Sequence, residues 1–203
     1  MLSGERAVLA RRGRRLEYFT IAWNSLEGLA AIGAGAVAGS ISLVGFGVDS
    51  FIEVTSGAAL LWRMSGDDDA RRERREAITL RIVGVCFVAL AAYVGFEAIR
   101  DLVSGSPPRP SAVGIVVAVV SLIVMPLLAR AKRHVARALA SGAMRADARQ
   151  TDFCMYLSAI LLAGLVLNLI AGWWWADPIA ALIMTPLIIK EGTSALRGDT
   201  CCD

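Results

Sequence analysis

The chain has 203 residues, 56% of them hydrophobic, and a mean hydropathy of +0.59, yet it carries 21 Lys and Arg and 18 Asp and Glu residues. The charged residues lie in blocks between long apolar runs, which indicates an integral membrane protein and excludes a separate soluble domain. The net charge of +3 is small, and we interpret the basic runs as topology signals and lipid contacts rather than as a nucleic-acid surface.

Six segments are apolar enough to cross a bilayer as helices of about 20 residues. They cover residues 18–37, 40–64, 77–102, 111–129, 151–172 and 176–196. We therefore expect an all-α membrane bundle over residues 18–196, a basic arm at 1–17 and a short tail at 197–203. No cleaved signal peptide is expected, and the spacing of the four cysteines predicts neither a disulfide framework nor a zinc ribbon.

Basic residues are concentrated in the arm and in the connections at 67–81 and 130–149, whereas the alternate connections carry one Arg between them. The positive-inside rule then places both termini in the cytoplasm of a multi-pass protein, which we expect in the cell membrane. Trp173, Trp174 and Trp175 would lie at the outer interface as an aromatic anchor.

The first span contains Asn24 and Glu27 on one helix face. Two roles remain open for Glu27: an ion or proton relay beside a main site, or a residue near the inner interface held by Asn24 or by an Arg of the arm. Gly35 and Gly39 have the spacing of small residues that allows close helix approach.

The second span contains two carboxylates, Asp49 and Glu53, on one helix face. Asp49 is roughly 15 Å from the turn at Gly39 if each residue rises about 1.5 Å, which places it near the bilayer centre. A carboxylate there costs a few kcal/mol or more, and two on one face repel unless a cation or a proton lies between them. We predict a cation site; the alternative is a pair satisfied by Ser or Arg of neighbouring helices.

The connections and the third and fourth spans give weaker signals. Glu97 and Asp101 are expected to pair with Arg100 at the outer end of the third span, and the fourth span is expected to serve packing. The acidic run at 67–69 is either a solvated loop or a cation-collecting segment. His134 is the single histidine and lies in a basic connection, so no imidazole is expected in the membrane core.

The fifth span presents Asp147, Gln150 and Cys154 on one helix face, whereas Asp152 points away from them. This face offers a carboxylate, an amide oxygen and a thiol, although a Cys in an apolar helix also serves packing. Cys154 is roughly 28 Å from Trp173 at helical rise, deeper than Glu53. The span therefore extends past the outer interface or kinks, or Cys154 lies near the inner mouth.

The sixth span begins with Asp177 and Pro178, a pattern that predicts an N-cap followed by the first helical position. Asp177 is therefore assigned to capping and not to ion binding. Cys201 and Cys202 form either a disordered tail or a thiolate pair that passes metal to the membrane site.

Four stretches together resemble the transmembrane domain of the cation diffusion facilitator (cation efflux) family over nearly the whole chain: GS at 39–40, VDSFIE at 48–53, RADA at 145–148 and WADPIA at 175–180. The resemblance implies a tetrahedral transport site with two residues one turn apart on the second helix and a His and an Asp one turn apart on the fifth. Asp49 and Glu53 fall on the first pair. Gln150 falls on the His position and Cys154 on the Asp position, so both fifth-helix positions depart from the family pattern.

The residues and the resemblance together predict a transporter of a divalent transition-metal cation, Zn²⁺ before others, because a thiolate suits Zn²⁺ and carboxylates tolerate it. Metal and protons would be exchanged because the ligands must lose protons to bind metal. We expect no enzymatic chemistry and no permanently bound cofactor. The resemblance implies a homodimer, here through membrane helices, because the chain ends soon after Leu196 and is expected to lack the family's cytoplasmic metal-binding domain. The competing interpretation is a non-transporting metal-sensing or partner-binding subunit, suggested by the same Gln150 and Cys154.

Overall fold

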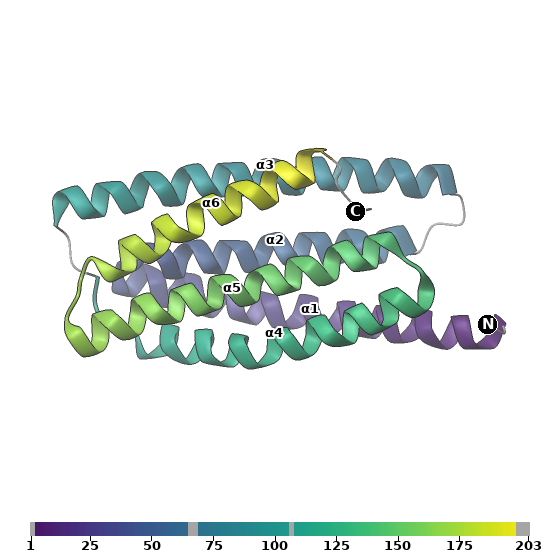
Figure 1. Cartoon of the computed structure of the whole chain (residues 1–203), viewed down its shortest axis with the longest axis horizontal. Helices are drawn as coiled ribbons and strands as arrows, with labels where there is room; N and C mark the ends of the chain where they lie inside the picture. Colours follow the sequence, from purple (N-terminus) through teal and green to yellow (C-terminus); the bar gives the residue numbers. More distant parts are fainter. Residues whose placement is uncertain (1–2, 65–68, 106–107, 198–203) are drawn as a thin grey trace.

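The computed structural model describes residues 3–64, 69–105 and 108–197, which form an elongated bundle of helices (Figure 1). The helices are α1 (Ser3–Ala38), α2 (Ile41–Met64), α3 (Asp69–Ser104), α4 (Ala112–Leu139), α5 (Gly142–Ala171) and α6 (Ala176–Arg197). Each of these six helices of the described chain contains a stretch long and apolar enough to span a membrane. The predicted all-α, six-span bundle is confirmed.

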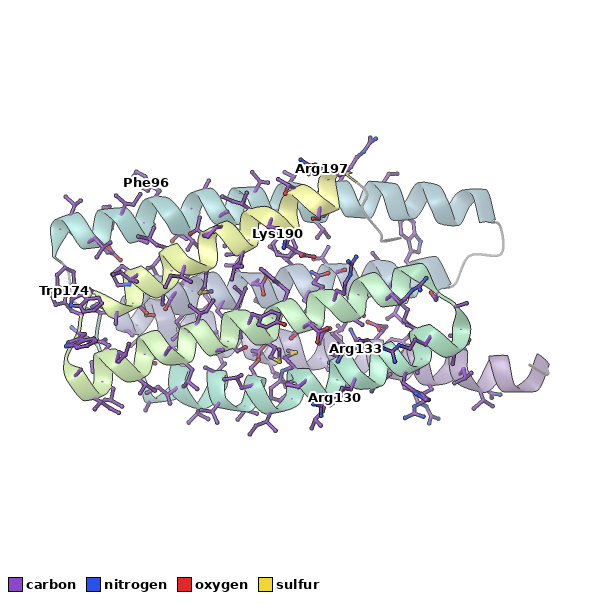
Figure 2. All side chains as sticks on the ribbon, viewed as in Figure 1. Phe96, Arg130, Arg133, Trp174, Lys190 and Arg197 are labelled. Atoms are coloured by element: carbon purple, nitrogen blue, oxygen red, sulfur yellow. The ribbon has the colours of Figure 1, made fainter. Side chains whose placement is uncertain are left out.

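Successive helices run in opposite directions, so the bundle has two distinct ends (Figure 1). The basic end carries the start of α1 and the turn between α4 and α5; the tryptophan end carries the turns before α2 and before α6. Trp173 and Trp175 stack at the tryptophan end with ring centroids 4.9 Å apart, and Figure 2 labels Trp174 at this end. Within the bundle α1 packs along α2, α4 along α5 and α3 along α6, and α2 also contacts α3, α5 and α6.

The helices are longer than the predicted spans. Most of the expected arm is helical because α1 begins at Ser3, and the expected connection at 130–149 shrinks to Ala140 and Ser141 between α4 and α5. Ala140 adopts a left-handed φ of 50°, and the hydroxyl of Ser141 accepts a hydrogen bond from the Met144 N–H at the start of α5. Arg, Lys, Ala and Glu are strong helix formers, so these basic segments continue the helices beyond the apolar stretch.

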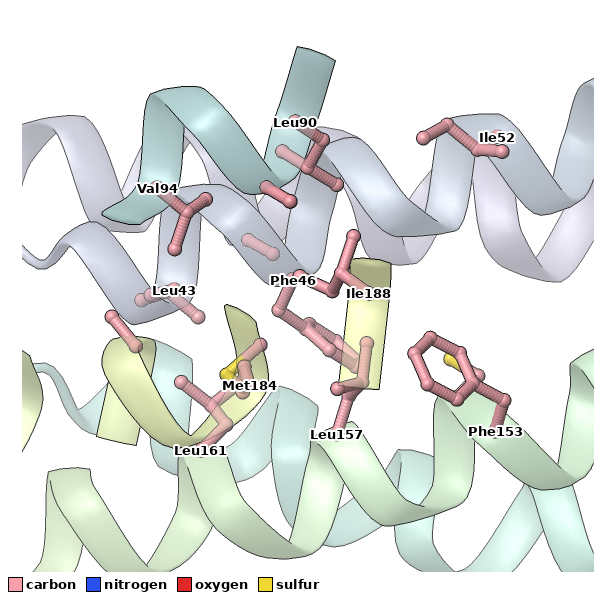
Figure 3. Packing of buried hydrophobic residues seen from close by; sticks show 14 of the residues in the cluster. Leu43, Phe46, Ile52, Leu90, Val94, Phe153, Leu157, Leu161, Met184 and Ile188 are labelled. Atoms are coloured by element: carbon pink, nitrogen blue, oxygen red, sulfur yellow. The ribbon is translucent and has the colours of Figure 1, made fainter. Parts of the chain in front are cut away.

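The main apolar core lies where α2, α3, α5 and α6 meet (Figure 3). Its buried side chains include Leu43, Phe46, Leu90, Val94, Leu157, Leu161, Met184 and Ile188. Large apolar side chains also point outward, among them Phe96, Val37 and Ile170. Outward apolar faces of this length suit contact with lipid acyl chains.

Glycines allow close helix contact at the crossing of α1 and α2. A Cβ added at Gly47 would lie 3.0 Å from the backbone oxygen of Gly28, and one added at Gly35 would lie 2.9 Å from the backbone nitrogen of Val44. Gly35 therefore has the predicted role in close approach. Gly39 does not, since it lies in the turn with a left-handed φ of 69° and nothing within 4 Å of an added Cβ.

Candidate cation site

Buried polar side chains fill the space between α1, α2, α4 and α5. We call this set the polar column, and it comprises Glu17, Asn24, Glu27, Asp49, Ser50, Glu53, Ser121, Lys132, Asp147, Gln150, Thr151, Cys154 and Ser158. Buried polar groups on this scale are costly in an apolar bundle unless they bind each other or a ligand. The column is therefore the candidate functional site of the molecule.

Glu53 fixes how α2 and α5 align in the column. The Thr151 hydroxyl donates a hydrogen bond to Glu53 Oε1 at 2.7 Å. Because the two helices are antiparallel, Asp49, one turn before Glu53, lies at the level of Cys154, nearly one turn after Thr151. The Cys154 thiol interacts electrostatically with the carboxylates of both Asp49 and Glu53. The structure thus brings together three of the five predicted ligands.

Counting residues from Trp173 places Cys154 deeper in the membrane than Glu53, and the unequal lengths of α2 and α5 explain this difference. α2 begins at Ile41, about two turns before Asp49, whereas α5 continues to Ala171, almost five turns beyond Cys154. α5 therefore extends past α2 at the tryptophan end, and counting inward from Trp173 overstates the depth of Cys154.

Glu27 lies beside these residues. The Ser50 hydroxyl donates to Glu27 Oε2 at 3.1 Å, and the Glu27 carboxylate interacts electrostatically with Asp49 and Glu53. Of the two roles left open for Glu27, its position fits the one beside the main site. Asn24 does not hold it, because both amide atoms of Asn24 lack a hydrogen-bond partner within the described residues.

Asp147 and Gln150, the other two predicted ligands, have different surroundings from Asp49, Glu53 and Cys154. Asp147 Oδ2 lies 2.6 Å from the Lys132 ammonium, which also lies 3.2 Å from Glu17 Oε2. Gln150 is buried, and its amide nitrogen has no hydrogen-bond partner in the part of the chain described. Asp147 thus belongs to an ion cluster one turn nearer the basic end than the Glu53–Thr151 contact.

Glu17 and Lys132 are not predicted as site residues from the sequence, because hydropathy assigns them to the arm and to a connection. A signal for Glu17 was present, since Glu17, Thr20, Asn24 and Glu27 recur at the spacing of one helix face and all four are buried. Lys132 had no comparable signal in a stretch rich in arginine.

Several buried acceptor atoms in the column have no donor. Asn24 Oδ1, Glu27 Oε1 and Glu53 Oε2 all lack a hydrogen-bond partner among the described residues. Unpaired buried acceptors of this kind are rare and call for a positively charged ligand or a proton. Across residues 3–64, 69–105 and 108–197, no three His, Cys, Asp or Glu side chains already stand in a metal-holding arrangement. A cation would therefore have to draw the carboxylates and the thiol inward.

Asp177 caps a different helix from the one predicted. α6 begins at Ala176, so Asp177 lies within its first turn and is not its N-cap. Its carboxylate accepts hydrogen bonds from the Ser40 hydroxyl at 2.6 Å, from the Ser42 hydroxyl and from the Ser42 backbone N–H at 3.5 Å. Asp177 thus caps the start of α2 from across the bundle.

Other predicted features lie outside the column. His134 is exposed on α4, and Arg100 pairs with Glu97 at 2.9 Å as expected. Cys201 and Cys202, and the first two residues of the 67–69 run, lie outside the described residues.

Comparison with known proteins identifies the bundle. Residues 18–198 match the family described as the cation efflux transmembrane domain. Similar proteins include an uncharacterized transporter of Synechocystis (24% identical; 82% of this chain, 56% of that protein), Transmembrane protein 163 of Xenopus laevis (26%; 89% and 65%) and the cation-efflux pump FieF of Escherichia fergusonii (28%; 71% and 50%). The chain thus spans between half and two thirds of the length of these relatives. The family match covers most of the chain, and the protein therefore belongs to the cation efflux family, with its transmembrane domain at residues 18–198.

Proposed function

We propose that this protein moves a divalent transition-metal cation, principally Zn²⁺, out of the cytoplasm in exchange for protons. The observation that carries the proposal is the convergence of Asp49, Glu53 and Cys154, all fully buried on α2 and α5, beside acceptor atoms that lack a donor. Membership of the cation efflux family supports the direction of transport.

The ligand set favours a borderline-soft cation. Two carboxylates and one thiolate suit Zn²⁺ and Cd²⁺ better than Mg²⁺ or Ca²⁺, which prefer oxygen ligands alone. Asn24, whose side chain lies near Glu53 without a hydrogen bond to it, offers a neutral oxygen as a fourth ligand, and Gln150 offers a weaker one a turn from Cys154. We place Asp147 outside the ligand set because Lys132 already neutralises it.

Proton exchange follows from the same ligands. A cation that binds carboxylic acids and a thiol displaces their protons, and protons that return release the cation. Loading from one side of the membrane and release to the other then couple metal movement to proton movement in the opposite direction.

The distribution of charge supports cytoplasmic termini. Exposed arginines gather at the basic end, among them Arg11, Arg12, Arg14, Arg15 and Arg137. The positive-inside rule assigns this end to the cytoplasm and the tryptophan end to the outer face of the cell membrane. A homodimer through membrane helices remains part of the proposal.

The experiment is metal uptake into proteoliposomes under a pH gradient, with Zn²⁺, Cd²⁺, Co²⁺ and Fe²⁺ offered in turn. We expect flux of Zn²⁺ above empty vesicles, and loss of that flux in Asp49→Ala and Glu53→Gln. Glu97→Gln is the control, because Glu97 pairs with the exposed Arg100 away from the column. Metal binding without flux of any of the four ions would instead indicate a metal-sensing subunit.

A further inference from the structure

Lys132 lies completely buried between two carboxylates, at a place separate from the site of Asp49, Glu53 and Cys154. Its ammonium is 2.6 Å from Asp147 Oδ2 and 3.2 Å from Glu17 Oε2, and the side chains of Lys132 and Glu17 are 0% exposed. The three residues come from α4, α5 and α1 respectively. A lysine this deeply buried is rare and is stable only because both acids face it.

The cluster holds more acceptors than Lys132 satisfies. Glu17 Oε1 and Asp147 Oδ1 are buried and have no hydrogen-bond partner in the described chain. With every group charged, two carboxylates face one ammonium and leave one negative charge uncompensated. One oxygen of each carboxylate lies within 3.2 Å of the ammonium, and carboxylate oxygens are also ligands for divalent metal ions.

Along the bundle, the cluster lies between the basic end and the candidate site. The Thr151 hydroxyl contacts both the Asp147 backbone oxygen at 3.3 Å and Glu53 Oε1 at 2.7 Å, so the two sites are about one helical turn apart. Lys132 also interacts electrostatically with Glu53. On the opposite side, the apolar side chains of Leu60, Val135, Ala136 and Met144 close the bundle.

We propose that Glu17 and Asp147 form a second cation-binding site. The Lys132 ammonium occupies this site while no divalent cation is bound there. A cation entering from the basic end displaces Lys132, binds the two carboxylates and then passes to Asp49, Glu53 and Cys154. When the cation leaves, Lys132 returns and closes the entrance. This inference rests on the proposed transport function. In it, Lys132 controls the access of the cation to the site formed by Asp49, Glu53 and Cys154.

A purely structural role predicts different behaviour. If the cluster only ties α1, α4 and α5 together, removing the ammonium leaves two unpaired buried acids and lowers stability, without creating a metal site. Cation-binding stoichiometry separates the two roles, because a structural tie does not change it.

The first test is equilibrium binding of Cd²⁺ and Zn²⁺ to the full chain in nanodiscs. The structure predicts that the wild type binds one ion tightly and a second one only at much higher metal concentration, where the metal must displace the Lys132 ammonium. Lys132→Met should bind two ions tightly, because loss of the ammonium frees Glu17 and Asp147. Lys132→Arg keeps the positive charge between the two carboxylates, so this variant should bind one ion per chain tightly, as the wild type does. Adding Glu17→Gln to Lys132→Met should return the number to one. An unchanged stoichiometry in Lys132→Met overturns the proposal.

A second test uses the unmodified protein and so does not depend on whether a variant folds. Lys132 and Lys190 are the two lysines of the sequence, and Lys190 is exposed on α6. Saturating Zn²⁺ should raise the rate of reductive methylation of Lys132 by about tenfold, measured by mass spectrometry, because the displaced ammonium becomes accessible. Lys190 should not change. A Lys132 rate that stays constant or falls with Zn²⁺ contradicts displacement.

The two proposals fail in distinguishable ways. A wild-type chain that neither binds nor moves Zn²⁺, Cd²⁺, Co²⁺ or Fe²⁺ refutes the transport function itself. A wild type that binds and moves metal, with no extra ion in Lys132→Met and no change at Lys132 in the labelling test, refutes the second site alone.

Discussion

Thr151 and Glu53 join the two helices that build the candidate site. The Thr151 hydroxyl donates to Glu53 Oε1 at 2.7 Å, while Glu53 Oε2 has no partner among the described residues. One oxygen of the carboxylate is therefore held by α5 and the other is free for a cation. The same contact aligns Asp49 with Cys154 across the interface.

Thr151→Val should weaken both folding and metal binding. The substitution keeps the side-chain shape but leaves Glu53 Oε1 buried without a donor, a change that costs about 1–3 kcal/mol. Thermal unfolding in detergent, with and without Cd²⁺, measures the loss of stability and the smaller stabilisation by metal.

Thr20→Val is the matched control. Thr20 is equally buried, but among the described residues its hydroxyl donates to the Leu16 backbone oxygen of its own helix and to no other helix. It should retain the full stabilisation by Cd²⁺. Equal responses to Cd²⁺ in the two variants would remove Thr151 from the site.

Asp49 and Glu53 could be located from the sequence because charge inside an apolar span is conspicuous. The sequence pattern also places Cys154 on one helix face with Asp147 and Gln150, but leaves its level open. The structure fits the alternative in which the fifth span is extended, since α5 continues past α2 by a length that no local pattern encodes. Helix faces are periodic in sequence, whereas the relative heights of two helices depend on tertiary contacts such as that between Thr151 and Glu53.

Glu17, Lys132 and Asp177 show the other limit. Hydropathy averages over a window, so Glu17 and Lys132 looked like parts of basic flanking segments although both are fully buried. The local pattern at Asp177 correctly indicated capping, but the capped N–H belongs to Ser42, far away in the sequence. Partners of this kind become visible only when the helices are assembled.

Cys154→Ser should change which metal the site prefers. Replacing the thiol by a hydroxyl removes the soft ligand, so Cd²⁺ and Zn²⁺ should bind more weakly relative to Mn²⁺, by about tenfold or more. Competition binding against Mn²⁺ measures the ratio. Cys86→Ser is the control, because Cys86 is exposed on α3. The same metal preference in both variants would exclude the thiol as a ligand.

Asp177→Ala should destabilise the start of α2. The substitution removes the carboxylate that accepts hydrogen bonds from the Ser40 and Ser42 hydroxyls and from the Ser42 N–H. The free energy of unfolding should fall by about 1–3 kcal/mol. Asp152→Ala removes a partly exposed ion pair with Arg133 and should cost about 0–1 kcal/mol. Thermal unfolding compares them, and a milder effect at Asp177 than at Asp152 would contradict capping across the bundle.

Gly47→Ala should separate α1 from α2 where Glu27 meets Ser50. An added Cβ would lie 2.9 Å from the Ile32 backbone nitrogen and 3.0 Å from the Gly28 backbone oxygen, and backbone atoms cannot rotate away. Overpacking of this kind costs about 1–3 kcal/mol, and the displaced Glu27 should also reduce Zn²⁺ flux.

Gly33→Ala on the same helix pair distinguishes contact from helix propensity. Nothing lies within 4 Å of a Cβ added at Gly33. Its unfolding temperature should therefore match or exceed that of the wild type, because alanine favours a helix over glycine by about 1 kcal/mol. If tryptophan fluorescence during heating shows Gly47→Ala to be as stable as Gly33→Ala, the backbones can move apart without cost. In that case the close crossing of α1 and α2 does not fix the position of Glu27 beside the cation site.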